Sequence, residues 1–212
     1  MTGVQTCALP ICREDYERTI EILNDGEGIA AYELNVSCPN TTQGGLQFGS
    51  DPRSLDEVVT TAKRIAQRPL MVKLSPNVTS IAQMAHIAQE AGADAISLIN
   101  TFVAMAIDPD TRKPRSANVT AGLSGPAIKP IALRMVYDAA HAVNIPVIGM
   151  GGISTAADVA EFMLAGATAV QIGTASYWDP CATEKIVGDL QAWCVDRGVS
   201  RLADLIGGLI VE

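Results

Sequence analysis

The chain has 212 residues, of which 48% are apolar and 18% charged, and its formal net charge is −8. This composition is typical of one soluble, acidic globular domain. The excess of acidic residues argues against a surface for nucleic acid or anionic lipid, because phosphate binding on that scale needs dense positive charge. The apolar runs are broken by Gly, Asp or Lys well short of the roughly 20 residues that span a bilayer.

Cysteine usage indicates a reducing compartment. The five cysteines are odd in number and none has CxxC spacing, which favours reduced thiols in the cytoplasm over a disulfide framework. His86 and His141 lie in helical patterns away from the cysteines. We therefore expect a cytoplasmic protein without a metal site.

The first residues differ from the rest. Residues 1–12 have no helical or strand period and lack the basic and apolar regions of a signal peptide. The string TGVQTCALPI (2–11) resembles the translation of a sequencing-library adapter. We expect residues 1–12 to be a non-native, adapter-derived segment and residues 13–212 to form one partial barrel domain.

From residue 13 onward, helical and strand patterns alternate. A polar, Gly/Pro-rich excursion interrupts the alternation at residues 105–129. The order is typical of buried parallel strands joined by crossover helices, and it predicts an α/β barrel, with an open doubly wound sheet as the alternative. We expect strands at 31–36, 70–74, 95–99, 146–149 and 169–172, and helices at 14–23, 54–67, 80–92, 130–143, 155–166 and 183–196.

Capping signals mark several helix ends. Gly92 and Gly166 follow helical patterns as C′ glycines. Three predicted helix starts carry a Ser or Thr followed three positions later by a polar side chain: Ser54 with Glu57, Ser80 with Gln83, and Thr155 with Asp158.

In a (β/α) barrel the active site lies at the carboxyl ends of the strands. The pairs Gly151-Gly152 and Gly173-Thr174 follow the last two predicted strands, where such barrels bind phosphate through backbone N–H groups. Either pair alone is equally consistent with a tight turn. Their occurrence after successive strands favours a phosphate site.

Lys73 is the only charge in its predicted strand. A lysine at a barrel mouth needs an anionic partner, and a flavin ring that gains negative charge on reduction is one such partner. The alternative is a lysine whose stem is buried and whose ammonium reaches the rim.

Cys38 lies in the loop after the first predicted strand, between Asn35 and Asn40. Its thiolate can act as a base or nucleophile, although a single Cys is more often structural. Since no His or Asp stands beside it, proton abstraction is favoured over acyl transfer. The amides of Asn35, Asn40 and Asn100 suit a planar ring with amide-like edges, or else cap loops. Trp178 and Trp193 are expected to pack.

Seven motifs occur together in one order: ELNVSCPN (33–40), QGGLQFGSDP (43–52), VKLSPNVTSI (72–81), SLINT (97–101), GLSGPAIKPIALR (122–134), GMGGI (149–153) and AVQIGTA (169–175). From about residue 14 to the C-terminus, the chain resembles dihydroorotate dehydrogenase, and more narrowly its class 1B catalytic subunit.

The resemblance implies an oxidoreductase, a flavoprotein with an FMN-binding (β/α)8 TIM barrel, that oxidises dihydroorotate to orotate in pyrimidine (UMP) biosynthesis. Cys38 would remove the C5 proton while a hydride passes to FMN. In class 1B, a partner subunit with FAD and [2Fe–2S] passes electrons to NAD, and the catalytic subunit forms a homodimer within a heterotetramer. The implied substrate residues are Asn35, Asn100 and Thr101, and the implied cofactor residues are Asn35, Lys73, Ile99, Gly125, Gly151, Gly152, Gly173 and Thr174.

The chain departs from the family pattern in places. Ala104 and Ala121 stand where the family usually has Gly, and the family's first three βα units are not found. With about five C-terminal βα units, an incomplete barrel exposes strand edges, so we expect the isolated chain to be unstable, to lose FMN and to be inactive. The alternatives are a dihydropyrimidine dehydrogenase-like flavin domain, a fumarate-using class 1A enzyme, or a non-catalytic phosphate-binding barrel.

Overall fold

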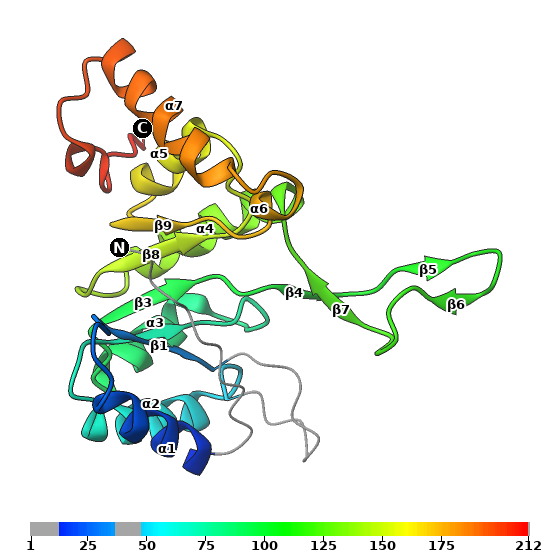
Figure 1. The fold of residues 1–212 in the computed structure, drawn as a ribbon, viewed down its shortest axis with the longest axis vertical. Coiled ribbons are helices and arrows are strands. Elements are labelled where there is room, and N and C mark those ends of the chain that lie inside the picture. The colour runs from blue at the N-terminus through cyan, green and yellow to red at the C-terminus, as the bar shows by residue number, and fades with distance from the viewer. Residues whose placement is uncertain (1–12, 37–47, 212) are drawn as a thin grey trace.

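The computed structural model describes residues 13–36 and 48–211 (Figure 1). Five parallel strands form one sheet in the order β1-β2-β3-β8-β9. Each predicted strand is confirmed to within a few residues: β1 (Tyr32–Asn35), β2 (Leu70–Lys73), β3 (Ala95–Leu98), β8 (Val147–Met150) and β9 (Ala169–Gln171).

Helices connect the successive strands and pack against one another on the outer face of the sheet (Figure 1). The C-terminal helix predicted at 183–196 is confirmed as α7, and the single-turn α6 before it was not predicted. In chain order the helices are α1 (Arg13–Asn24), α2 (Pro52–Ile65), α3 (Ile81–Glu90), α4 (Lys129–Ala140), α5 (Ala156–Leu164), α6 (Ala175–Trp178) and α7 (Ala182–Asp196), with 3-10 turns η1 (Pro126–Ile128) and η2 (Leu202–Leu205).

The strands alternate between two faces. Leu70, Val72, Ile96 and Leu98 are fully buried and face the helices. The residues between them on β1 and β2 are only half-buried, because they face the inside of the curved sheet. The core therefore lies between the sheet and the helices, and the inner face is free to carry polar side chains.

The sheet curls as a barrel does. Gln171 on one edge strand donates a hydrogen bond from Nε2 to Oε2 of Glu33 on the opposite edge strand, at 2.9 Å. In a flat sheet these strands would lie about 19 Å apart, since neighbouring strands are about 4.8 Å apart. The fold is an incomplete (β/α)8 barrel, and no helix in its described part is long and apolar enough to cross a membrane.

The excursion after β3 forms an arm that projects from the body (Figure 1). It is not helical, as predicted, but its two short antiparallel ladders were not predicted, because strands of two or three residues are too short to show a period. They pair β4 (Phe102–Ala104) with β7 (Ala121–Leu123), and β5 (Ile107–Asp108) with β6 (Lys113–Pro114).

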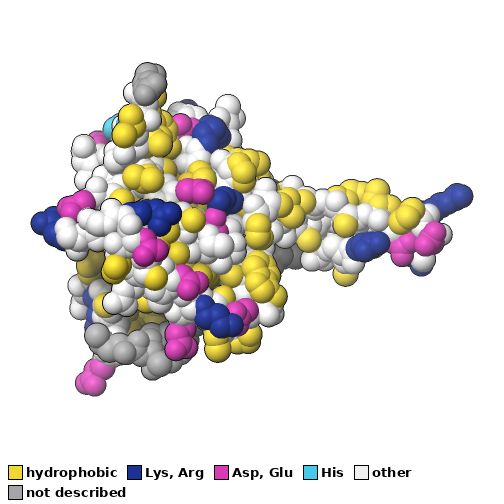
Figure 2. Space-filling view, turned by 90° about the horizontal axis from the view of Figure 1, so that it is seen from above, with side chains coloured by type: hydrophobic (Ala, Val, Ile, Leu, Met, Phe, Trp, Pro, Cys, Tyr) yellow, Lys and Arg dark blue, Asp and Glu magenta, His cyan; other side chains and the backbone are white. Residues whose placement is uncertain are grey.

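The arm stands clear of the body in space-filling view, with apolar side chains along it and charged ones at its tip (Figure 2). Val103, Met105 and Ile107 are each about half exposed. The two departures from the family pattern, Ala104 and Ala121, are direct cross-strand partners in its first ladder. Each Ala therefore lies opposite another small residue.

The capping predictions divide. The Ser80 hydroxyl accepts from the Gln83 backbone N–H, and Thr155 with Asp158 forms a complete capping box. The prediction at Ser54 is wrong, because α2 begins two residues earlier, after Asp51. The Asp51 carboxylate accepts from the backbone N–H of Ser54, and Pro52 occupies the first helical position, where its missing N–H costs nothing.

A glycine in β8 tests the packing of the outer face. A Cβ added at Gly149 would lie 2.6 Å from the buried ring of Phe162, so Gly149→Ala should lower the free energy of unfolding by about 1–3 kcal/mol. Gly188 in α7 has open space around it, so Gly188→Ala should instead raise stability by up to about 1 kcal/mol. Urea unfolding measures both, and equal effects would contradict the packing described.

Candidate functional site

A cavity of about 260 Å³ lies at the carboxyl ends of the strands. It brings together nine of the residues predicted from sequence, drawn from five separate loops and strand ends: Lys73, Ile99, Asn100, Thr101, Gly125, Gly151, Gly152, Gly173 and Thr174. Its remaining lining residues are Ser124, Ile128, Met150, Ile153, Gln171, Ile172, Ala175 and Trp178. Cys38 and Asn40 lie outside the described residues.

Two predicted amides meet at one side of the cavity. Asn100 donates from Nδ2 to Oδ1 of Asn35, at 3.1 Å, and its own Oδ1 accepts from the backbone N–H of Thr101. Asn35 is therefore joined to the cavity wall through Asn100. The pair therefore places amide donor and acceptor groups next to Thr101.

Asn77 supports this side of the cavity and was not singled out from sequence. Its Nδ2 donates to the carbonyl of Thr101 and its Oδ1 accepts from the backbone N–H of Val103, both at 3.1 Å. The loop after β2 thereby holds the segment that begins the arm. The available signal was its position directly after a strand end, in the SPN part of a recognised motif.

Glu33 is another residue that sequence reasoning missed. Its Oε1 lies 3.9 Å from Nζ of Lys73, which gives that lysine an anionic partner within the chain. Its Oε2 accepts from the hydroxyl of Ser97 at 3.1 Å and from Gln171 at 2.9 Å. Glu33 was recognisable as a charge in an otherwise apolar strand, by the same reasoning that identified Lys73.

Three loops converge on the opposite side of the cavity. Gly152 packs so closely on the loop before α4 that an added Cβ would lie 2.8 Å from the carbonyl oxygen of Gly125. Thr174 donates from its hydroxyl to that of Ser124 at 2.8 Å. Gly151 and Gly152 both have positive φ, which a side chain would disfavour. Glycine-rich turns in this arrangement can bind phosphate through backbone N–H groups.

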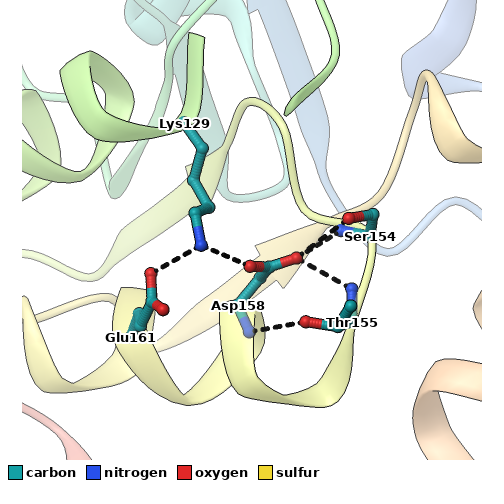
Figure 3. Close-up of polar contacts among 5 residues, drawn as sticks. All are labelled: Lys129, Ser154, Thr155, Asp158 and Glu161. Carbon is teal, nitrogen blue, oxygen red and sulfur yellow. Dashed lines mark hydrogen bonds and ion pairs between the residues drawn. The ribbon is translucent and has the colours of Figure 1, made fainter. Parts of the chain in front are cut away.

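An ion pair ties two of these loops together (Figure 3). Lys129, the first residue of α4, lies 2.5 Å from Oδ1 of Asp158 and 2.9 Å from Oε2 of Glu161 in α5. The other Asp158 oxygen accepts from the backbone N–H groups of Ser154 and Thr155, each at 2.8 Å. The Asp158 side chain is only 8% exposed, so these contacts are largely shielded from water.

These contacts change the acidity of both partners. Burial by itself would raise the pKa of Asp158, but hydrogen bonds from Lys129, Ser154 and Thr155 outweigh it and lower the pKa from 3.8 to about 2. The hydrogen bond with Asp158 is the main cause that raises the pKa of Lys129. Both groups are therefore charged at neutral pH.

Trp178 does not pack as predicted. It lines the cavity and is 58% exposed, because α6 is a single turn that leaves the ring at the rim. The guanidinium of Arg197 lies 4.5 Å from the ring of Trp193. The contrast arises from their positions, since Trp178 ends the single-turn α6, outside the predicted helices, whereas Trp193 lies within α7.

The charge on Glu33 should be needed because Lys73 faces it. Glu33→Gln keeps the shape but leaves the ammonium without its counter-charge, so we expect a loss of about 1–3 kcal/mol in the free energy of unfolding. Adding Lys73→Met should recover at least half of that loss. Urea unfolding of both single variants and the double variant gives the coupling, and strictly additive effects would show that the pair does not interact.

Asp158 should make the chain acid-sensitive. Its folded-state pKa lies below the ordinary value, so its contribution to stability is present above about pH 4 and is lost as the pH falls toward 2. Between those limits the native chain should lose up to about 2 kcal/mol more than Asp158→Asn. Unfolding by urea at several pH values measures this difference, and parallel curves would refute it.

Residues 1–193 match the family model described as dihydroorotate dehydrogenase. A putative dihydroorotate dehydrogenase A (fumarate) from Solibacter usitatus is 57% identical over 98% of this chain and 68% of that protein. A dihydroorotate dehydrogenase B (NAD(+)), catalytic subunit, from Pelobacter propionicus is 51% identical over 92% of this chain and 64% of that protein.

A solved structure shares the fold. The crystal structure of DHODH from Eimeria tenella, in complex with ferulenol, superposes with a TM-score of 0.76 at 24% identity, covering 92% of this chain and 57% of that one. The chain spans about two thirds of the length of the curated relatives that it matches.

Proposed function

Because this chain belongs to the dihydroorotate dehydrogenase family, we propose that it carries the FMN and substrate sites of an enzyme that oxidises dihydroorotate to orotate in de novo pyrimidine biosynthesis. The observation that supports the proposal most strongly is that nine residues expected at those sites line one cavity. They come from loops far apart in the sequence, so their meeting is not a consequence of local sequence pattern.

The residues present fit FMN. The close approach of Gly152 to Gly125 leaves turns that only glycine can make, and such turns direct backbone N–H groups toward a phosphate. Lys73 and Ile99 line the cavity next to them, where a cation and an apolar side chain suit an electron-rich ring. When bound, FMN supplies a hydride acceptor.

The chain's own residues would position the substrate and move one proton. Asn35, Asn100 and Thr101 offer amide and hydroxyl groups that match the imide edge of dihydroorotate. Cys38, in the SCPN motif, is proposed as the base that takes the proton from C5. Asn77 would keep Thr101 in place through its carbonyl.

The physiological acceptor distinguishes two forms of the proposal. The Pelobacter propionicus relative is named for NAD(+), which supports a class B enzyme whose partner subunit carries FAD and [2Fe–2S], with a homodimer of catalytic subunits in a heterotetramer. The Solibacter usitatus relative, at 57% identity, is named for fumarate, which favours a class A enzyme as the second candidate.

The proposal is tested by adding dihydroorotate to the FMN-loaded protein without oxygen. The assay uses this chain and a version completed with the third of the Solibacter usitatus relative that the chain does not cover. Bleaching of the flavin absorption by dihydroorotate supports the proposal. Return of the absorption when uracil is added to the reduced flavin would favour a dihydropyrimidine dehydrogenase-like reaction instead. Reoxidation by fumarate identifies class A, and reoxidation by NAD only with an added partner subunit identifies class B.

Cys38→Ala should slow flavin reduction by dihydroorotate about 10²–10⁴-fold in the same completed protein, since a general base contributes on that scale. FMN affinity should stay unchanged, because the thiol is proposed to act on substrate. Cys194→Ala serves as the matched control, since Cys194 is a free thiol outside the cavity. Equal rates for the two variants would rule out the base role.

A further inference from the structure

We propose that Lys129 is a positioning residue for phosphate: by pairing with Asp158 it locks the turn at residues 151–154 against the turn at 124–128. This inference deepens the proposed function and rests on it, since it concerns the phosphate end of the same cavity. It assigns a role to a side chain that does not itself line the cavity.

The pair joins the starts of two helices that follow different strands (Figure 3). Lys129 begins α4, directly after η1, whose N-terminal cap is Gly125. Asp158 lies in the first turn of α5, directly after the Gly151-Gly152 turn. The ion pair between Lys129 and Asp158, at 2.5 Å, therefore connects the two loops that are proposed to bind the phosphate.

The backbones of these two loops pack against each other so closely that their relative position is fixed. A Cβ on Gly152 would lie 2.9 Å from Cβ of Lys129 and 3.0 Å from its backbone nitrogen. Gly152 is thus fitted directly against the residue that makes the ion pair. A small movement of α4 relative to α5 would open this contact and separate the N–H groups of the two turns.

Lys129 is better suited to hold the turns than to bind phosphate directly. Its ammonium already contacts two carboxylates, Asp158 at 2.5 Å and Glu161 at 2.9 Å, so its charge is neutralised within the protein. Asp158 in turn fixes the turn at residues 151–154, because its second oxygen accepts hydrogen bonds from the backbone N–H groups of Ser154 and Thr155. With the turns ordered during folding, little ordering remains to be done when an anion binds.

Lys129→Met tests the ion pair with Asp158 separately from the cap of helix α5. It removes the ammonium but leaves the capping box between Thr155 and Asp158 in place. Lys63→Met is the matched control, because Lys63 also pairs with an aspartate that accepts a backbone N–H, Asp94, at the opposite end of the strands. Lys129→Arg keeps the positive charge and should therefore keep FMN binding close to that of the native protein.

The test compares FMN with riboflavin, which lacks the phosphate, by fluorescence titration of the chain and of the completed protein. Lys129→Met should weaken FMN binding about ten-fold and change riboflavin binding less than two-fold. Lys63→Met should change neither, and Lys129→Arg should lie within about three-fold of the native protein. Equal weakening of both flavins by Lys129→Met would overturn the proposal, since a general loss of stability acts on both.

A second measurement does not depend on flavin. Amide hydrogen exchange of the chain alone should become about ten-fold faster at residues 150–155 in Lys129→Met and stay unchanged at residues 70–74. Failure of the proposed function looks different, because the native protein would then bind FMN no more tightly than riboflavin. In that case the hydrogen exchange of Lys129→Met is the test. Faster exchange at residues 150–155 supports the positioning role of Lys129, and unchanged exchange overturns it.

Discussion

The contacts of the Glu33 carboxylate hold together the polar side chains on the inner face of the barrel. It faces Lys73 on the neighbouring strand and accepts hydrogen bonds from Ser97 and from Gln171 on the opposite edge strand. A charge inside a curved sheet must be paired and hydrogen-bonded, and the bond that Glu33 accepts from Gln171 can form only if the sheet curls. The same curl brings the carboxyl ends of four strands around one cavity, and the end of β1 is joined to it through the hydrogen bond between Asn100 and Asn35.

The loops above this inner face are organised by a second carboxylate. Asp158 caps α5 and binds Lys129 of α4, so the turns at Gly125 and Gly152 are held together by charge as well as by close backbone packing. The arm grows out of the same region, since its first ladder lies between Thr101 and Gly125. Substrate-side and phosphate-side residues are therefore carried at the two bases of one projecting ribbon.

The parts that could be predicted from sequence are those governed by local chemistry. Ser80 and Thr155 cap their helices as expected, because a hydroxyl can reach an N–H three residues on wherever a helix starts. The cap predicted at Ser54 is wrong because Asp51, three residues earlier, accepts the backbone N–H of Ser54 itself. The helix therefore begins at Pro52. The ladders of the arm were missed because strands of two or three residues have no readable period.

By itself, the sequence determined the order of strands and helices, the glycine turns after the last two strands, and the family, since apolar periodicity and short motifs are local properties of a chain. Tertiary structure alone decided which residues meet. Glu33 and Gln171 are 138 residues apart, and Trp178, which was expected to pack, lines the cavity instead. Such neighbours arise from sheet curvature and from the packing of successive loops, which no local pattern encodes.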